Sequence, residues 1–213
     1  MNKPYRTRIK FCGLTRVQDL RMAADLAVDA VGLVFVPQSP RCVSIAQAMD
    51  FKAAMPPMLS SVALFMNQDV DTVQTVIYAL RPSLLQFHGE ESNEFCLQFG
   101  IPYLKAIPMA SPQSAAAMLS AHPEAAGYIL DGHRHGEAGG QGRGFDWQSM
   151  PRLERPWLLA GGLQPETVAE AISQCRPWGV DVASGIESAP GVKDPQRMQT
   201  FINEVRRADQ RDI

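Results

Sequence analysis

Residues 10–15, KFCGLT, and residues 180–187, VDVASGIE, decide the fold of this chain. Each segment is typical of a short apolar strand that runs into a turn with a polar or glycine-bearing tip. In a closed barrel of parallel strands the first and last strands are neighbours. The Cys12 thiol and the turn Ser184-Gly185 would then share one mouth, although they lie far apart in the sequence. A thiol beside an anion-binding turn indicates an enzyme that acts on a phosphorylated small molecule.

The rest of the chain alternates in the same way between strand and helix. Strands are predicted over residues 8–12, 30–36, 59–66, 84–87, 103–106, 127–131, 157–160 and 179–182. Helices are predicted over residues 16–27, 44–54, 70–80, 92–99, 112–121, 165–174 and 194–207, with a weaker one over 145–153. Strands that alternate with helices indicate a parallel sheet covered on both faces. Eight such units predict a closed α/β barrel, the (β/α)8 or TIM barrel, as one domain over residues 1–213, with an open doubly wound sheet as the main alternative.

Composition narrows the class of protein and of ligand. Hydrophobic residues make up 46% of the chain, enough for a full core, and the formal net charge is -2. Such a charge gives no general attraction to nucleic acid or to a membrane surface, so a substrate anion must be caught by local geometry. No apolar run reaches the roughly 18 residues of a membrane helix, and no signal-peptide pattern follows the first residues. We therefore expect a cytoplasmic monomer or homodimer with a small-molecule substrate and no nucleic-acid or membrane partner.

Cys12 and Asp131 are the residues best suited to acid–base chemistry. Cys12 lies between a strand and a helix start, where Thr15 and Gln18 are spaced as a capping box. Because helix N-termini stabilise anions, we expect a lowered thiol pKa and a role as base or nucleophile; the alternative is a small buried core residue. Asp131 follows three apolar residues at a strand tip, where desolvation would raise its pKa and make it a general acid. The alternative there is an ordinary turn with Gly132.

Two small-residue turns predict a phosphate site. Gly161-Gly162 follows the seventh predicted strand, and Ser184-Gly185 follows the eighth. Such turns let backbone N–H groups approach an anion closely. Each is a weak signal alone, but together they match the phosphate site that TIM barrels build from the loops after their last two strands. No GxGxxG fingerprint opens an early helix, which argues against a dinucleotide site.

Arg41, His88 and Asp181 complete the polar strand tips. Arg41 could clamp a substrate carboxylate or lie solvated on the surface. His88 could hydrogen-bond the substrate or fix a loop. His133 and His135 have no third ligand in the sequence pattern, and the four cysteines form no CxxC pair, so the sequence predicts neither a metal nor a redox cofactor.

Taken in order, these motifs resemble the phosphoribosylanthranilate isomerases of tryptophan biosynthesis. The segments that carry the resemblance are KFCGLT at 10–15, SPR at 39–41, QFHG at 86–89, LD at 130–131, GGQG at 139–142 with FDW at 145–147, LAGGL at 159–163, and VDVASGIE at 180–187 with PGVKD at 190–194. The resemblance spans the whole chain.

The resemblance implies a (β/α)8 barrel that isomerises N-(5-phosphoribosyl)anthranilate to 1-(2-carboxyphenylamino)-1-deoxyribulose 5-phosphate, an Amadori rearrangement. It also implies roles for the residues at the mouth. Cys12 would be the general base, Asp131 the general acid and Arg41 the group that holds the anthranilate carboxylate. Gly161, Gly162, Ser184 and Gly185 would hold the phosphate, and His88 and Asp181 would be further active-site residues.

Two positions depart from the pattern of that family. The family usually has Thr where Gln141 stands, within a glycine-rich stretch over residues 136–144 that would form either a lid or a plain connection. It usually has Ser where Ala183 stands, which removes one hydroxyl near the phosphate.

Other functions are compatible with parts of the pattern. A metal-dependent pentose-phosphate epimerase would need His and acidic ligands at several strand ends, and the chain shows too few. An indole-glycerol-phosphate synthase would need lysines at the catalytic strand tips, and the positions of Lys10 and Lys105 leave that alternative open. A non-catalytic phosphate-binding barrel would keep the glycine turns without needing Cys12 and Asp131 together.

Overall fold

The predicted barrel is confirmed by the computed structural model, which describes residues 6–109, 111–132 and 153–211. Eight parallel strands close into a barrel in chain order, with the first strand paired to both the second and the eighth. The strands are β1 (Arg8–Cys12), β2 (Ala30–Val34), β3 (Ser60–Phe65), β4 (Leu84–Phe87), β5 (Tyr103–Pro108), β6 (Gly127–Asp131), β7 (Trp157–Leu159) and β8 (Gly179–Val182). The alternative prediction of an open doubly wound sheet is therefore wrong.

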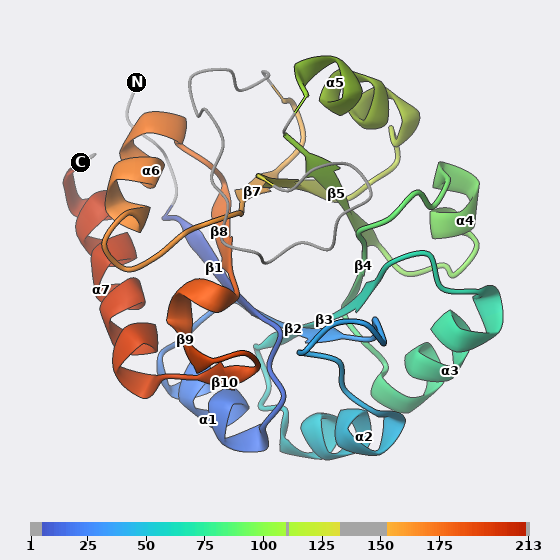
Figure 1. Ribbon diagram of the computed structural model, residues 1–213, viewed down its shortest axis with the longest axis horizontal. Helices are drawn as coiled ribbons and strands as arrows, with labels where there is room; N and C mark the ends of the chain where they lie inside the picture. The colour runs from blue at the N-terminus through green and yellow to red at the C-terminus, as the bar shows by residue number, and fades with distance from the viewer. Residues whose placement is uncertain (1–5, 110, 133–152, 212–213) are drawn as a thin grey trace.

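The helices form a ring around the barrel (Figure 1). They are α1 (Val17–Asp25), α2 (Ile45–Ala54), α3 (Val70–Leu80), α4 (Asn93–Leu97), α5 (Pro112–Ala121), α6 (Val168–Cys175) and α7 (Pro195–Arg211). A short 3-10 helix, η2 (Ser184–Ile186), follows β8 and leads into a hairpin of β9 (Glu187–Ala189) and β10 (Val192–Lys193). Across the described residues, no helix combines the length and the apolar character needed to cross a membrane. The helix predicted over 145–153 lies outside the described residues except for Leu153.

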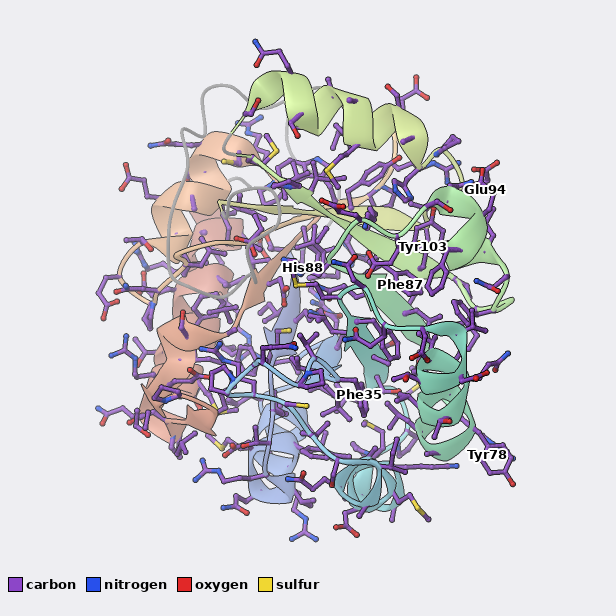
Figure 2. All side chains as sticks on the ribbon, turned by 45° about the vertical axis from the view of Figure 1, so that its right-hand side comes forward. Phe35, Tyr78, Phe87, His88, Glu94 and Tyr103 are labelled. Carbon is purple, nitrogen blue, oxygen red and sulfur yellow. The ribbon has the colours of Figure 1, made fainter. Side chains whose placement is uncertain are left out.

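The alternation of side chains along each strand separates the core into an outer and an inner part. On β1, Ile9 and Phe11 pack into the large apolar layer between the barrel and the helices. Cys12 instead belongs to a small apolar cluster with Val34 and Leu64 near the mouth. Because successive strand residues point to opposite faces, Lys10 shares the inner face with Cys12. In Figure 2, His88 lies near the middle of the molecule and Tyr78 at its outer edge.

The predicted capping box at the start of α1 is wrong. The residue that precedes α1 is Arg16, and its side chain makes no capping hydrogen bond. The Thr15 hydroxyl donates instead to the backbone carbonyl of Gly191, in the turn of the β9–β10 hairpin. A complete capping box forms at α2, between Ser44 and Gln47. Thr15 therefore ties the loop after β1 to the loop after β8, and it stabilises the mouth of the barrel rather than a helix end.

Candidate active site

One pocket at the carboxyl ends of the strands brings together eight of the nine site residues predicted from sequence. These are Cys12, Arg41, His88, Asp131, Gly161, Gly162, Asp181 and Ser184. They come from the ends of six of the eight strands or from the loops that follow them. The closure of β1 against β8 places the Cys12 thiol and the Ser184 turn in the same mouth.

Gly185, the ninth predicted residue, does not line this pocket. A Cβ at this position would lie 1.9 Å from the backbone carbonyl oxygen of Leu163, so the two loops after β7 and β8 touch at backbone level. Gly161 and Gly162 both have positive φ, at 85° and 69°, a conformation that side chains disfavour. All three glycines therefore meet a steric or conformational requirement of the two loops.

A buried ion pair supports the floor of the pocket. Lys10 stands opposite Asp181 in the pairing of β1 with β8, and its Nζ donates to Asp181 Oδ1 at 2.9 Å. Both side chains are nearly inaccessible to solvent. Burial alone would lower the pKa of Lys10, but attraction to Asp181 and to Cys12 outweighs it and raises that pKa. Burial raises the pKa of the Asp181 carboxyl; Lys10 opposes this rise, and nearby Asp131 adds to it.

Gly32 on β2 leaves the space in which Lys10 and Cys12 meet. A Cβ at Gly32 would lie 2.8 Å from Cys12 Sγ and 3.2 Å from Lys10 Nζ. The positive charge of Lys10 lowers the pKa of the Cys12 thiol and so opposes the effect of burial. The thiol of Cys12 is thus directly beside a permanent positive charge inside the barrel.

The expected lowering of the Cys12 pKa is wrong. Burial raises the pKa of this thiol above its ordinary value of 9.0, and the opposing effects of Lys10 and Lys193 do not cancel that rise. The helix that was expected to lower the pKa begins only at Val17. Positive charges from two lysines, rather than a helix end, favour the thiolate.

The pH dependence of alkylation tests this electrostatic arrangement. In the wild-type protein, alkylation of Cys12 should rise with pH and reach its midpoint above pH 9.0, because the thiolate reacts and its formation is suppressed by burial. The substitution Lys10→Met should move the midpoint higher still, since a charge that favours the thiolate is lost. Peptide-level mass spectrometry follows each cysteine separately. Cys175, whose pKa burial raises to about 11, is the internal control and should be unchanged; a lower Cys12 midpoint in the variant would contradict the arrangement.

Asp131 and His88 face each other across the pocket. Asp131 is 5% exposed, and its Oδ2 lies 3.9 Å from His88 Nε2. The His88 ring is held on its other side by Gln86, whose Nε2 lies 3.4 Å from His88 Nδ1. The Asp131 carboxyl is therefore buried and next to an imidazole, while the residues that would complete a turn after Gly132 lie outside the described residues.

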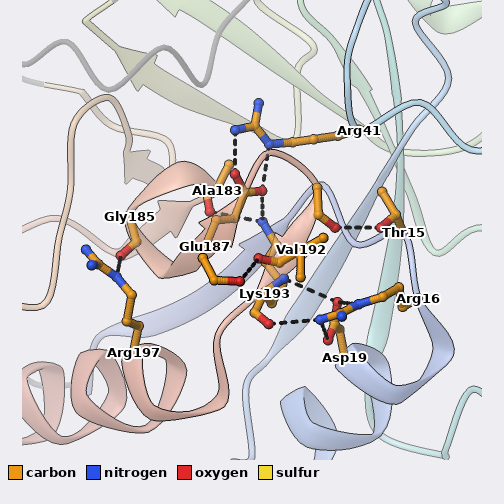
Figure 3. Close-up of polar contacts among 12 residues, drawn as sticks. Thr15, Arg16, Asp19, Arg41, Ala183, Gly185, Glu187, Val192, Lys193 and Arg197 are labelled. Atoms are coloured by element: carbon orange, nitrogen blue, oxygen red, sulfur yellow. Dashed lines mark hydrogen bonds and ion pairs between the residues drawn. The ribbon is translucent and has the colours of Figure 1, made fainter.

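Arg41, Glu187 and Lys193 form a second buried network at the rim (Figure 3). Arg41 donates from Nε and Nη2 to the two carboxylate oxygens of Glu187, each at 2.8 Å. Lys193 donates to Glu187 Oε1 at 2.8 Å and to the carbonyl of Ala183 at 2.9 Å. Burial would raise the pKa of Glu187, but the hydrogen bond from Arg41 and the charge of Lys193 hold it below its ordinary value.

Glu187 uses only one edge of the Arg41 guanidinium. The Nε and Nη2 groups face Glu187, and no described residue accepts a hydrogen bond from Nη1. The end of the fork, formed by Nη1 and the second proton of Nη2, is therefore available to the pocket that Arg41 lines. Arg41 is thus a fixed guanidinium with one edge to offer to a planar anion, and not a solvated surface residue.

Comparison with known proteins decides between the enzyme classes that such a pocket allows. The family model for N-(5'phosphoribosyl)anthranilate (PRA) isomerase matches residues 9–204. The chain belongs to this family. An N-(5'-phosphoribosyl)anthranilate isomerase of Xylella fastidiosa is 51% identical, with 98% of this chain and 96% of the relative covered.

Solved structures of the isomerase family share the fold. A crystal structure of the Thermotoga maritima phosphoribosyl anthranilate isomerase is 32% identical, has a TM-score of 0.83, and is matched over 94% of this chain and 98% of that one. Another family structure is a complex with reduced 1-(o-carboxyphenylamino)-1-deoxyribulose 5-phosphate. It is 30% identical, has a TM-score of 0.80, and covers 94% of this chain and 98% of that one.

Family membership agrees with where the lysines lie. Lys105, which left the synthase alternative open, is on the helix-facing side of β5 and bonds to Glu91 and to the carbonyl of Gly89. Lys10 is engaged by Asp181. Within the described ranges, no three His, Cys, Asp or Glu side chains gather as metal ligands would. His133, His135, Gln141 and the glycine-rich stretch over 136–144 lie outside the described residues.

Sequence reasoning missed several residues that shape this isomerase-family pocket. Lys10 carried a usable signal, because the two-residue period of a strand places it on the same face as Cys12. Gln86 carried the same signal relative to His88. Lys193 lies in the segment PGVKD at 190–194 that carries the family resemblance, but no local pattern gives it a role, since its contacts with Glu187 and Ala183 depend on the fold of the β9–β10 hairpin.

The substitution Glu187→Gln tests the buried network at the rim. Loss of this charge leaves Arg41 and Lys193 buried without their anion, so we expect the free energy of unfolding to fall by about 3 kcal/mol. Denaturant unfolding measures the change. Glu204→Gln, which breaks an exposed ion pair with Arg207 on α7, is the matched control and should leave the unfolding midpoint near the wild-type value. Equal effects of the two substitutions would contradict the structural role of Glu187.

Proposed function

We propose that this protein converts N-(5-phosphoribosyl)anthranilate to 1-(2-carboxyphenylamino)-1-deoxyribulose 5-phosphate, with Asp131 as general acid and Cys12 as general base. The observation that carries the proposal is the meeting of a buried carboxyl and a buried thiol in one pocket of a chain that belongs to the isomerase family. The two groups come from β6 and β1, so they can approach a bound sugar from different sides.

Asp131 carries out the first step. Its carboxyl proton goes to the ribose ring oxygen, the bond between that oxygen and C1 breaks, and the electron pair of the bond stays on the oxygen. The anilino nitrogen lone pair forms a double bond to C1, which gives an iminium ion. Burial of Asp131 supports this role, because desolvation disfavours the charged form of a carboxyl and so favours a proton that can be donated.

Cys12 carries out the second step. Its thiolate takes the proton from C2. The C–H electron pair becomes the second bond between C1 and C2, and the π pair of the C1–N double bond returns to nitrogen. The enolamine then loses its hydroxyl proton, gains a proton on C1 and becomes the ketone. The iminium charge beside the thiol, together with Lys10, favours the thiolate at the moment when it is needed.

The ends of the substrate fit the two remaining parts of the pocket. The free edge of Arg41 suits the anthranilate carboxylate, since a guanidinium binds a carboxylate through two parallel hydrogen bonds. The phosphate would lie at the loops after β7 and β8, on Gly161, Gly162, Ser184 and Gly185, where η2 provides the short extra helix of TIM-barrel phosphate sites. Gly185 would contribute only through its backbone, since it does not line the pocket.

The test is turnover of N-(5-phosphoribosyl)anthranilate by the purified wild-type protein. The proposal expects formation of the ketone product without added metal or cofactor. Tight binding of a reduced product analogue with no turnover at any pH would instead support a non-catalytic phosphate-binding barrel and overturn the proposal.

A further inference from the structure

We propose that Gln86 and His88 are positioning residues for the general acid, with Gln86 fixing the His88 tautomer that presents Nε2–H to Asp131. This inference rests on the proposed function, because it assigns a task within the same reaction. Gln86 and His88 would act through Asp131, and neither would exchange a proton or form a covalent bond with the substrate.

The three side chains form a line across the floor of the pocket. Gln86 is on the inner face of β4 and is 1% exposed. Its Nε2 lies 3.4 Å from His88 Nδ1, and His88 Nε2 lies 3.9 Å from Asp131 Oδ2. All three residues line the pocket. A change in the hydrogen bonding of Gln86 can therefore affect Asp131 through the His88 ring.

The chemistry of an amide and an imidazole makes the line directional. An amide NH2 group can only donate, so His88 Nδ1 must accept and the ring proton must lie on Nε2. An imidazole with its proton on Nε2 then directs a donor at the Asp131 carboxyl. With the opposite tautomer, a lone pair would face the carboxylate and repel it once Asp131 has given up its proton.

The orientation of the Gln86 amide has a second consequence. Its Oε1 is buried and accepts no hydrogen bond from the described residues. A buried carbonyl oxygen without a donor is costly, so this atom gains when a ligand donor enters the pocket. Substrate binding would therefore hold the amide in the orientation that keeps Nε2 on His88.

The loop that carries His88 is anchored from outside the pocket. The His88 backbone N–H donates to the carbonyl of Phe65 at 2.9 Å. Glu91 accepts from the backbone of Gly89 and from the fully buried Lys105, each at 2.9 Å. The imidazole thus stands on a fixed backbone, and only the tautomer and the ring orientation remain for Gln86 to set.

Nitrogen NMR of the wild-type protein tests the tautomer without any assay of activity. With labelled histidine, the His88 ring should show a protonated Nε2 and an unprotonated Nδ1 at neutral pH. His122 is a buried internal reference that should stay neutral, because burial lowers its pKa to about 4. A His88 ring with its proton on Nδ1, or on both nitrogens, would overturn the inference.

Substitutions test the consequence for catalysis. Gln86→Met keeps the length of the side chain but removes the donor, and it should lower kcat by about 10-fold to 100-fold with little change in KM. His88→Gln retains an N–H near the Nε2 position and should keep more activity than His88→Leu. Equal loss in the two His88 variants, or an unchanged kcat in Gln86→Met, would overturn the inference. Wild-type protein without turnover would refute the proposed function instead, and the NMR result would still stand by itself.

Discussion

Cys12→Ser should lower kcat by between about 100-fold and 10,000-fold, the usual contribution of a positioned general base. The hydroxyl is close to the thiol in size, so the packing against Val34 and Leu64 is kept. A hydroxyl is a far weaker acid than a thiol, and the variant therefore has no anion at neutral pH to take the proton from C2. Steady-state kinetics should show the loss in kcat, with KM near the wild-type value.

The matched control is Cys175→Ser. Cys175 ends α6 and lies outside the pocket, so the same change of sulfur to oxygen should leave turnover unaltered. Wild-type turnover by Cys12→Ser would remove Cys12 from the mechanism. The alternative reading of Cys12, a small core residue, predicts a change in stability without a change in kcat.

Asp131→Asn should lower kcat by a similar factor, because it removes the general acid instead of the general base. The amide has the shape of the carboxyl but no acidic proton, so the ring oxygen leaves without being protonated and ring opening becomes slow. We expect kcat to fall by about 100-fold to 10,000-fold, measured with the same assay as for Cys12. Asp50→Asn, an exposed position on α2, is the control and should behave as the wild type.

The sequence of the two steps distinguishes the two variants, because ring opening precedes removal of the C2 proton. In Asp131→Asn the ring stays closed, so C2 never becomes acidic and its proton should not exchange with solvent. In Cys12→Ser the ring can still open, and the iminium form should accumulate or return to substrate. Rapid exchange of the C2 proton in Asp131→Asn would contradict the assignment of Asp131 to the first step.

The barrel and most of its pocket could be predicted because they depend on local pattern. Strands β1, β4, β6 and β8 have the predicted limits, since each is a short apolar run bounded by clear turn residues. Once the strands close in order, every strand tip faces the same mouth. That rule alone gathers Cys12, Asp131 and Ser184 from three distant parts of the chain.

The remaining errors come from contacts between loops. Thr15 stands in a capping sequence pattern, but its hydroxyl donates a hydrogen bond to the Gly191 carbonyl instead. The predicted second strand extends to residue 36, whereas β2 ends at Val34, whose carbonyl accepts from Val43 in the returning loop. The expected lowering of the Cys12 pKa is wrong because α1 begins only at Val17, and burial by other strands raises the pKa of the thiol. None of these competing contacts is visible within a few residues of the position concerned.

The measurement that tests the central claim most directly is a crystal structure of this protein with reduced 1-(o-carboxyphenylamino)-1-deoxyribulose 5-phosphate. We expect the phosphate at Gly161, Gly162 and Ser184, and the ligand carboxylate on the free edge of Arg41. The sugar chain should then lie between Cys12 Sγ and the Asp131 carboxyl, with each group about 3 Å from a ligand atom. A fully occupied ligand whose phosphate lies elsewhere, or whose chain is out of reach of either group, would contradict the account.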